Sequence, residues 1–438
     1  MTGLISMVYS RVYFSFRKLL SNTQAVLRST TVLGSRRITF AAFRTIVTAA
    51  QEQHSIQVNW DKEKDTWSKF HYEWLRDNCP CTKCRHPDFD QRLLSSLEDA
   101  TPSNIDVKGS DVVEIEWKDG HRSRYSYKWL LDNSYCHHNL NKPETEKRRE
   151  VILWDRDTMV NPPVVNYDDV MANDKGLLEL LRNIYCFGVC FVPDTPVAPE
   201  AMMELATKIG PIRQTYYGTQ WFMEAGNMSV NHVSYTKEKI LSHTDNPYLQ
   251  HPPGLFCLHA VEYVSGEGGE TTLTDGFKIA SYIKQHNPEY FSLLSNVSVL
   301  YKIAFKDKLL KDEAIYKSRQ YTFTVDDDGE MMGVNINHVD RRPLDEISLS
   351  QAKKTLSCGA DEAMKKMYSA LHLLHQLVYS GQFTYKVGLQ PGNMVLMNNW
   401  RVSHGRNILS TGFRRISGIY LNRDEWMSKL MVLEQHND

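Results

Sequence analysis

The chain has 438 residues and a formal net charge of -1, from 51 basic and 52 acidic side chains. This balance gives no generally cationic surface, so neither a nucleic acid nor an acidic membrane surface is expected as a partner. The sequence has no run of about 18 apolar residues, which argues against a membrane span. Eight cysteines in a chain this long do not make a disulfide framework, and we expect thiols.

The first 50 residues differ in charge from the rest. They carry seven basic side chains and no acidic one, and they are rich in Ser and Thr, with Leu, Val and Phe between the arginines. This composition predicts an amphipathic mitochondrial presequence and therefore a matrix protein; the alternative is a disordered basic tail on a cytoplasmic protein. The remaining residues contain 44 basic and 52 acidic side chains, so the mature protein is expected to be acidic.

Residues 51–141 show short, strand-like alternation and are predicted to form a small N-terminal domain. In Val112–Trp117 apolar and acidic side chains alternate, a Lys-Asp-Gly turn follows at residues 118–120, and residues 121–125 alternate again. This is the pattern of a β-hairpin. Residues 142–152 are mostly charged, have little to bury and are predicted to be a linker.

Residues 153–438 are predicted to form the larger domain. A helix is expected from about Asp174, followed by an apolar strand at residues 189–192, and a second helix is expected over residues 361–379. Further strands are expected at residues 254–264, 331–337, 392–402 and 414–421. Many short strands with few helices predict a mainly β fold, a sandwich or jelly roll with added helices.

Three closely spaced cysteines suggest a zinc site. Cys79, Cys81 and Cys84 lie within six residues, so one tight loop can direct three thiolates at one tetrahedral ion. His121, just after the predicted hairpin turn, is the candidate fourth ligand, with His86 as the local alternative; three unrelated buried thiols are the other interpretation. With four protein ligands the zinc would be structural, in a domain with little core of its own.

A second metal site is suggested by the pattern His-x-Asp with a distant His. In a strand residues i and i+2 point the same way, so this pattern supplies the two-His, one-carboxylate triad that binds Fe(II) on one side. Four His-x-Asp pairs occur, at His86/Asp88, His243/Asp245, His338/Asp340 and His436/Asp438. Two of them are poor candidates, because one lies beside the cysteines and the other at the chain end.

The context of His243/Asp245 favours that pair. A proline- and glycine-rich turn and a strand follow it, and far downstream His404 ends a predicted strand. Ten residues later Arg414 begins another strand. In a jelly roll with His404 on the metal, Arg414 is expected one strand over, where its guanidinium could form a bidentate pair with a dicarboxylic cosubstrate.

The sequence Trp-Leu-Arg-Asp-Asn-Cys-Pro-Cys at residues 74–81, together with residues 242–254 and 399–405, resembles a known family. It is that of gamma-butyrobetaine dioxygenase and trimethyllysine dioxygenase, the 2-oxoglutarate-dependent hydroxylases of carnitine biosynthesis. The resemblance implies a zinc-binding N-terminal domain, a double-stranded β-helix catalytic domain and a homodimer. It also implies the following sites: Fe(II) on His243, Asp245 and His404; zinc on Cys79, Cys81, Cys84 and His121; and 2-oxoglutarate on Arg414, with Thr271 nearby.

The same resemblance implies a substrate with a trimethylammonium group and a carboxylate. The cation would lie in an aromatic cage, because such a group binds through cation-π contacts; its members would be Tyr217, Trp221, Tyr235 and Tyr420. Asn337 matches one of two asparagines that hold the carboxylate, but the other position is His232. Either a protonated His232 or the neighbouring Asn231 would have to take that role.

Two related reactions remain open. The main prediction is hydroxylation of C3 of gamma-butyrobetaine to L-carnitine, with succinate and CO2 as coproducts and ascorbate as reductant; the alternative is hydroxylation of trimethyllysine at C3. Less favoured are another oxygenase of this fold and a non-catalytic zinc-scaffold protein, since the triad and Arg414 are all present.

Overall fold

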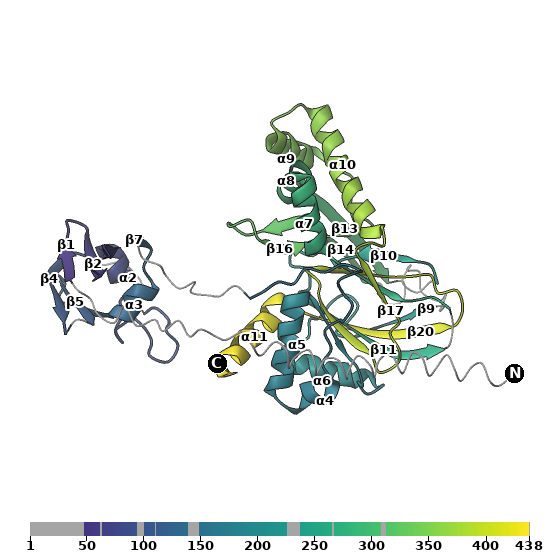
Figure 1. The fold of residues 1–438 in the computed structure, drawn as a ribbon, viewed down its shortest axis with the longest axis horizontal. Helices are drawn as coiled ribbons and strands as arrows, with labels where there is room; N and C mark the ends of the chain where they lie inside the picture. Colours follow the sequence, from purple (N-terminus) through teal and green to yellow (C-terminus); the bar gives the residue numbers. More distant parts are fainter. Residues whose placement is uncertain are drawn as a thin grey trace. The chain divides into compact units, whose positions relative to one another are not determined.

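The computed structural model describes residues 48–61, 64–93, 100–109, 111–138, 149–225, 237–264, 267–307 and 312–437. The predicted presequence lies outside these residues, apart from residues 48–50, which belong to strand β1 (Thr48–Gln51). The chain forms two compact units, Met1–Arg148 and Arg149–Asp438 (Figure 1).

Among its described residues, the first unit contains two antiparallel sheets and two short helices. One sheet has the order β1-β2-β3-β7 and the other β4-β5-β6. The elements after β1 are β2 (Ser55–Asp61), β3 (Thr66–His71), α2 (Tyr72–Asp77), β4 (Pro102–Lys108), β5 (Val112–Trp117), β6 (Arg122–Ser126), α3 (Tyr127–Asp132) and β7 (Cys136–His138). Strands β5 and β6 form the predicted hairpin, and Gly120 takes the left-handed conformation that its turn requires, with φ of 81°.

The first unit has a larger core than the sequence predicted. Alternate side chains of β5 point inward, and Ile115 and Trp117 are completely or almost completely buried. They share one hydrophobic cluster with Trp60, Phe70 and Leu75, among others. The expectation of a domain with little core of its own was therefore wrong, because aromatic side chains spread over several short strands converge in space.

Two antiparallel sheets form the centre of the second unit. Their strands are β8 (Val189–Val192), β9 (Trp221–Ala225), β10 (Ile240–His243), β11 (Leu255–Val264), β12 (Thr271–Asp275), β17 (Thr384–Val387), β18 (Met394–Asn398), β19 (Val402–Arg406) and β20 (Phe413–Leu421). One sheet has the order β10-β19-β12-β17 and the other β8-β18-β11-β20-β9. Side chains from both sheets pack in one buried cluster, for example Leu273 of β12 with Phe256 of β11.

Helices cover the second unit in two groups (Figure 1). Helices α4 (Tyr167–Ala172), α5 (Asp174–Phe187), α6 (Pro199–Ile209) and α11 (Arg423–Asn437) pack on the outer face of the five-stranded sheet. Helices α7 (Gly276–His286), α8 (Pro288–Asn296), α9 (Glu346–Leu356) and α10 (Ala360–Tyr379) form a second core with β13 (Ser298–Asp307), β14 (Asp312–Tyr321), β15 (Phe323–Val325) and β16 (Met331–Val334). The described residues thus contain more helix than expected, while the predicted mainly β fold with helices is confirmed.

The predicted strand at residues 392–402 is in fact two strands. Strand β18 ends at Asn398, and the Asn398 side chain accepts a hydrogen bond from the Trp400 N–H, while the Arg401 N–H donates to the Asn398 carbonyl. These bonds close a turn, and β19 begins at Val402. His404 therefore lies in the middle of a strand and not at the end of one.

A buried ion pair stabilises this turn. The Arg401 guanidinium donates through Nε and Nη2 to the two carboxylate oxygens of Asp275, at 3.0 and 2.8 Å, and both side chains are almost completely buried. Arg401 also donates to the Cys186 carbonyl, and Asp275 caps helix α7 by accepting from the Phe277 N–H. The pair joins the start of β19, the end of β12 and helix α7.

We expect Asp275→Asn to lower the free energy of unfolding of the second unit by about 3–5 kcal/mol, because it leaves the Arg401 charge buried without its partner. Urea unfolding of the purified protein measures this change. The control is Glu289→Gln, which removes a partner of Lys366 at the surface and should have little effect. Equal stability of the two variants would contradict the assigned role of the ion pair.

Candidate functional site

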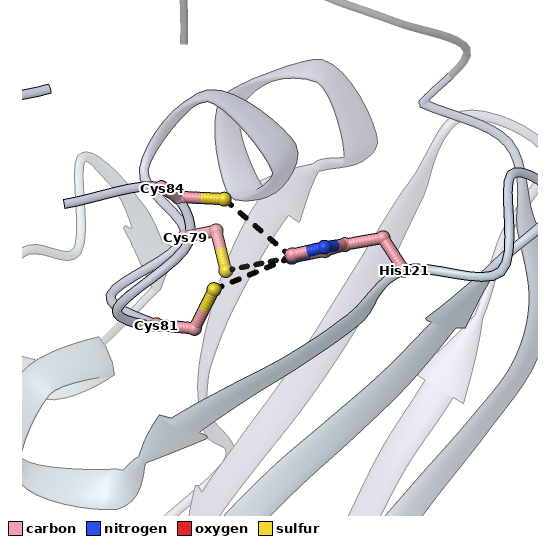
Figure 2. Close-up of side chains that lie close together, drawn as sticks. All are labelled: Cys79, Cys81, Cys84 and His121. Carbon is pink, nitrogen blue, oxygen red and sulfur yellow. Dashed lines mark hydrogen bonds between the residues drawn. The ribbon is translucent and has the colours of Figure 1, made fainter. Parts of the chain in front are cut away.

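The three cysteines and His121 converge in the first unit (Figure 2). The Nε2 atom of His121 lies 3.3 Å from Cys79 Sγ, 3.6 Å from Cys81 Sγ and 3.5 Å from Cys84 Sγ. In a tetrahedral zinc site with Zn–S bonds of about 2.3 Å and a Zn–N bond of about 2.0 Å, sulfur and nitrogen are about 3.5 Å apart. The spacing therefore fits zinc. His86, the alternative ligand, stacks on Phe89 instead.

Two further side chains hold this cluster in place. Arg76 donates to Cys84 Sγ at 3.6 Å and to Asp119 at 2.9 Å, and Asp119 accepts the His121 N–H at 2.8 Å. Burial, followed by the charge of Cys79, raises the pKa of Cys84 to about 12. Zinc binds cysteines as thiolates, so the charge of a bound ion would offset the cost of deprotonating a thiol such as that of Cys84.

In the second unit the structure brings together His243, Asp245 and His404. His243 of β10 is directly opposite His404 of β19, with ring centroids 4.6 Å apart. Asp245 Oδ1 lies 3.3 Å from His243 Nε2, and Asp245 Oδ2 lies 3.8 Å from His404 Nε2. The side chains remain 22, 13 and 11% exposed, so the group is open to a ligand.

A β-bulge produces this pairing. Ile240 pairs with Arg406 and His243 with His404, so β10 has one more residue than β19 between these positions. Such a bulge changes the direction of the side chains that follow it, and here it directs His243 toward His404. Gly405 makes room for it, because a Cβ at that position would lie 2.5 Å from the Ile240 carbonyl oxygen.

Hydrogen bonds and nearby charges set the orientation and the pKa values of the triad side chains. His243 Nδ1 donates to the Leu241 carbonyl at 2.8 Å, so Nε2 is the ring atom that faces Asp245. Burial lowers the pKa of His243, but the hydrogen bond and charge of Asp245 outweigh it, so the pKa is raised and a metal ion would have to displace a proton from Nε2. Burial opposes the charge of Asp245, but His404, His243 and the Tyr420 hydroxyl outweigh it and lower its pKa to about 2. Burial lowers the pKa of His404 to about 4, which keeps that ring neutral. A carboxylate with two imidazoles is a donor set that Fe(II) accepts.

Arg414 lies on the other sheet from His404. Strand β20 belongs to the five-stranded sheet, so the expectation that Arg414 is one strand over was wrong; the chain crosses between the sheets after β19. Arg414 is buried and donates to Thr271 Oγ1 and to the Gly269 carbonyl, both at 2.7 Å. Thr271 is opposite Arg406, two residues and about 7 Å along the sheet from the level of His404.

Aromatic side chains line the interior beside the triad. The Tyr420 hydroxyl donates to Asp245 Oδ2 at 2.8 Å, and the Tyr420 ring stacks on Phe256, 5.0 Å between centroids. Trp221 of β9 lies 6.0 Å from Tyr420 and crosses over Gly418, where a Cβ would meet the indole at 2.2 Å. Two predicted cage members thus lie together next to the triad.

Tyr217, the third predicted cage member, lies in a second aromatic group. The residue is 39% exposed, and its ring contacts Phe305 edge-on, with 5.3 Å between centroids. Tyr217 and Tyr248 are neighbours whose hydroxyl groups interact. Burial and then the Tyr217 hydroxyl raise the pKa of Tyr248. The sequence interpretation missed Tyr248 and Phe305, although Tyr248 follows Asp245 by only three residues. Tyr235 and His232 lie outside the described residues, as does Asn231.

Asn337 lies against the backbone of the triad. Its Nδ2 donates to the Thr244 carbonyl at 3.3 Å and to Asp340 Oδ2 at 2.9 Å, and its Oδ1 accepts the Asp340 N–H. His338, from the competing His-x-Asp pair, bonds instead to the Tyr379 hydroxyl at 2.9 Å. Within the described residues His338 joins no group of potential metal ligands.

The taurine catabolism dioxygenase TauD, TfdA family profile matches residues 155–420, and a gamma-butyrobetaine hydroxylase-like N-terminal profile matches residues 47–131. A trimethyllysine dioxygenase of Meyerozyma guilliermondii is 32% identical over 89% of this chain and 96% of its own length. The chain belongs to the gamma-butyrobetaine and trimethyllysine dioxygenase family. The resemblance inferred from the sequence is confirmed, and this family member is an oxidoreductase of the dioxygenase class.

Relatives of both kinds have similar identities to this dioxygenase. The human gamma-butyrobetaine dioxygenase is 27% identical over 87% of this chain and 95% of its own length. The human mitochondrial trimethyllysine dioxygenase is 28% identical over 88% of each chain. Among solved structures, a putative alpha-ketoglutarate-dependent taurine dioxygenase from Burkholderia xenovorans covers 57% of this chain and 83% of its own, with 13% identity and a TM-score of 0.41. In the described parts of the chain, no helix has the length and apolarity to span a membrane.

We expect Cys81→Ser to lose zinc and to lower the melting temperature, because three ligands hold the ion more weakly than four. Metal analysis and thermal unfolding of the purified protein test this. Cys136→Ser, in the same unit but outside the cluster, is the control and should keep its zinc. Full zinc retention in Cys81→Ser would remove Cys81 from the ligand set.

His243→Ala should abolish Fe(II) binding and leave zinc content unchanged, because the two ligand groups lie in different units. Anaerobic titration with Fe(II), followed by metal analysis, measures both. The control is His338→Ala, which should retain Fe(II) binding. The opposite result, with iron lost only in the His338 variant, would place the metal at the other His-x-Asp pair.

Proposed function

We propose that this dioxygenase uses Fe(II) and 2-oxoglutarate to hydroxylate C3 of gamma-butyrobetaine, forming L-carnitine with succinate and CO2. The proposal rests on the ligand atoms of His243, Asp245 and His404, which lie within 4.8 Å of one another on partly exposed side chains. Buried Arg414 donates to Thr271, which lies two residues along the sheet from the level of His404. Dioxygenases of the matched family use Fe(II) and 2-oxoglutarate.

The residues fit distinct roles in this reaction. His243, Asp245 and His404 would hold Fe(II), which when bound supplies the activation of O2 and the oxidation of a C–H bond. Arg414, oriented by Thr271, would pair with the far carboxylate of 2-oxoglutarate, since a guanidinium binds a carboxylate through two parallel hydrogen bonds. Tyr420 holds one Asp245 oxygen through its hydroxyl and thereby orients the carboxylate.

The substrate would be held at both ends by this chain's side chains. Trp221 and Tyr420 offer aromatic faces beside the triad, and Tyr217 with Tyr248 offers more. A trimethylammonium group donates no hydrogen bond and binds such faces by cation-π attraction. Asn337, together with His232 or Asn231, would bind the carboxylate. This placement would put a carbon between the two ends over the triad.

One contact favours trimethyllysine as a second candidate substrate. Asn337 Nδ2 donates to the Asp340 carboxylate, so an acidic side chain lies where the substrate's own carboxylate would bind. Gamma-butyrobetaine has only a carboxylate at that end, whereas trimethyllysine also has an α-ammonium that Asp340 would attract. The similar identities to relatives of both kinds match this balance.

The remaining features of the proposal concern the first unit and the setting of the enzyme. Zinc on Cys79, Cys81, Cys84 and His121 would have a purely structural role, since all four positions are protein ligands. A mitochondrial location is supported by the composition of residues 1–50 and by relatives named as mitochondrial. We also propose ascorbate as reductant and a homodimer as the assembly.

A side-by-side assay separates the two substrates. With Fe(II), ascorbate and O2, we expect the protein to consume 2-oxoglutarate and release succinate when gamma-butyrobetaine is added, with a higher kcat/KM than for trimethyllysine. Succinate release and hydroxylated product are measured together by mass spectrometry. Turnover of trimethyllysine alone would transfer the proposal to that substrate. Turnover of neither would refute both.

A further inference from the structure

Asp245 lies outside the regular sheet. Strand β10 ends at His243, and the chain bends at Asp245 before Asn246 takes a left-handed conformation with φ of 57°. An Asp245 backbone that leaves the strand needs other hydrogen-bond partners, because buried peptide groups are almost always paired. The orientation of its carboxylate toward a metal depends on those partners.

The side chain of Asn399 supplies them. Asn399 is 1% exposed and lies in the turn between β18 and β19. Its Oδ1 accepts the Asp245 N–H at 2.7 Å, and its Nδ2 donates to the Asp245 carbonyl at 3.0 Å. The primary amide thus pairs with both peptide groups of one residue, as a neighbouring β-strand would.

The same amide also fixes the loop beyond Asp245. Asn399 Nδ2 donates a second hydrogen bond to the Pro253 carbonyl at 3.0 Å, and the Asn399 N–H donates to the Gly254 carbonyl at 3.0 Å. Both amide hydrogens and the amide oxygen are therefore used. Asp offers no donor, Ala offers neither group, and Gln is longer by one methylene, so only Asn completes this arrangement.

Asn399 also connects two of the triad residues. It lies five residues before His404, and the turn that contains it continues directly into β19. On the other side of Asp245, the Tyr420 hydroxyl holds Oδ2 at 2.8 Å. Asn399 thus holds the backbone of Asp245, and Tyr420 holds its carboxylate.

We propose that Asn399 is a positioning residue, which sets the backbone of Asp245 so that its carboxylate meets a metal ion together with His243 and His404. This inference rests on the proposed Fe(II) site. Residues that orient a metal ligand in this way usually change metal affinity by about 10- to 100-fold when they are replaced. A residue with a merely structural role would lower the melting temperature and leave the affinity of the folded protein unchanged.

The test compares Fe(II) affinity in Asn399→Asp and Asn399→Ala with that of the unmodified protein. Asn399→Asp keeps an acceptor for the Asp245 N–H but removes both donors and places a carboxylate against two carbonyls, and Asn399→Ala removes all three bonds. Anaerobic Fe(II) titration, read by the absorption that appears with 2-oxoglutarate, gives the dissociation constant. Both variants should bind Fe(II) about 10- to 100-fold more weakly, and both should consume more 2-oxoglutarate than they form product.

Asn398→Asp is the matched control. Asn398 is the buried neighbour of Asn399, and its side-chain oxygen accepts from the Trp400 N–H, a bond that Asp can keep. This variant should bind Fe(II) as the unmodified protein does. Thermal unfolding shows that each protein is folded at the temperature of titration.

Three results would overturn the proposal: unchanged affinity in both Asn399 variants, an equal loss of affinity in Asn398→Asp, or failure of both Asn399 variants to fold. Failure of the unmodified protein to bind Fe(II) is a different result, which would refute the proposed function itself.

Discussion

The register between strands β10 and β19 is the constraint on which the site depends. Side chains alternate between the faces of a sheet, so a slip of one residue would turn His404 away from His243. The bulge between Ile240 and His243 creates the observed pairing, and Gly405 leaves the space that the bulge needs. The turn before β19 is then fixed by the buried Arg401–Asp275 pair and by the amide of Asn399. A rigid frame of this kind can hold three ligands in place before any metal binds.

In the proposed function, two kinds of interaction act on the cationic substrate: the long-range field of the acidic protein and direct contacts with aromatic rings. The chain after residue 50 has an excess of acidic side chains, and this field would favour the approach of a cationic substrate. The surfaces proposed to contact that cation are the neutral rings of Trp221 and Tyr420. Under the proposed function, specificity would depend on the carboxylate end of the substrate, near the hydrogen-bonded pair Asn337 and Asp340. The two candidate substrates differ at that same end.

Much of the fold followed from the sequence, because local patterns carry it. The β5–β6 hairpin, helix α5 and helix α10 were predicted from alternation and helical spacing, and the His-x-Asp pattern identified two triad members. The division of residues 392–402 into two strands was missed, since a turn closed by the Asn398 side chain leaves no break in hydrophobicity. The crossing of Arg414 to the second sheet and the contact of Asn399 with Asp245 depend on tertiary structure. No pattern within either segment indicates them.

We propose that this dioxygenase binds two different metals, iron among His243, Asp245 and His404 and zinc among three cysteines and His121. Anomalous diffraction from crystals grown anaerobically with Fe(II), recorded on both sides of the iron and zinc absorption edges, tests it most directly. We expect an iron peak within bonding distance of the triad and a zinc peak within bonding distance of Cys79, Cys81, Cys84 and His121. A triad without an iron peak, or iron beside His338 and Asp340, would contradict it.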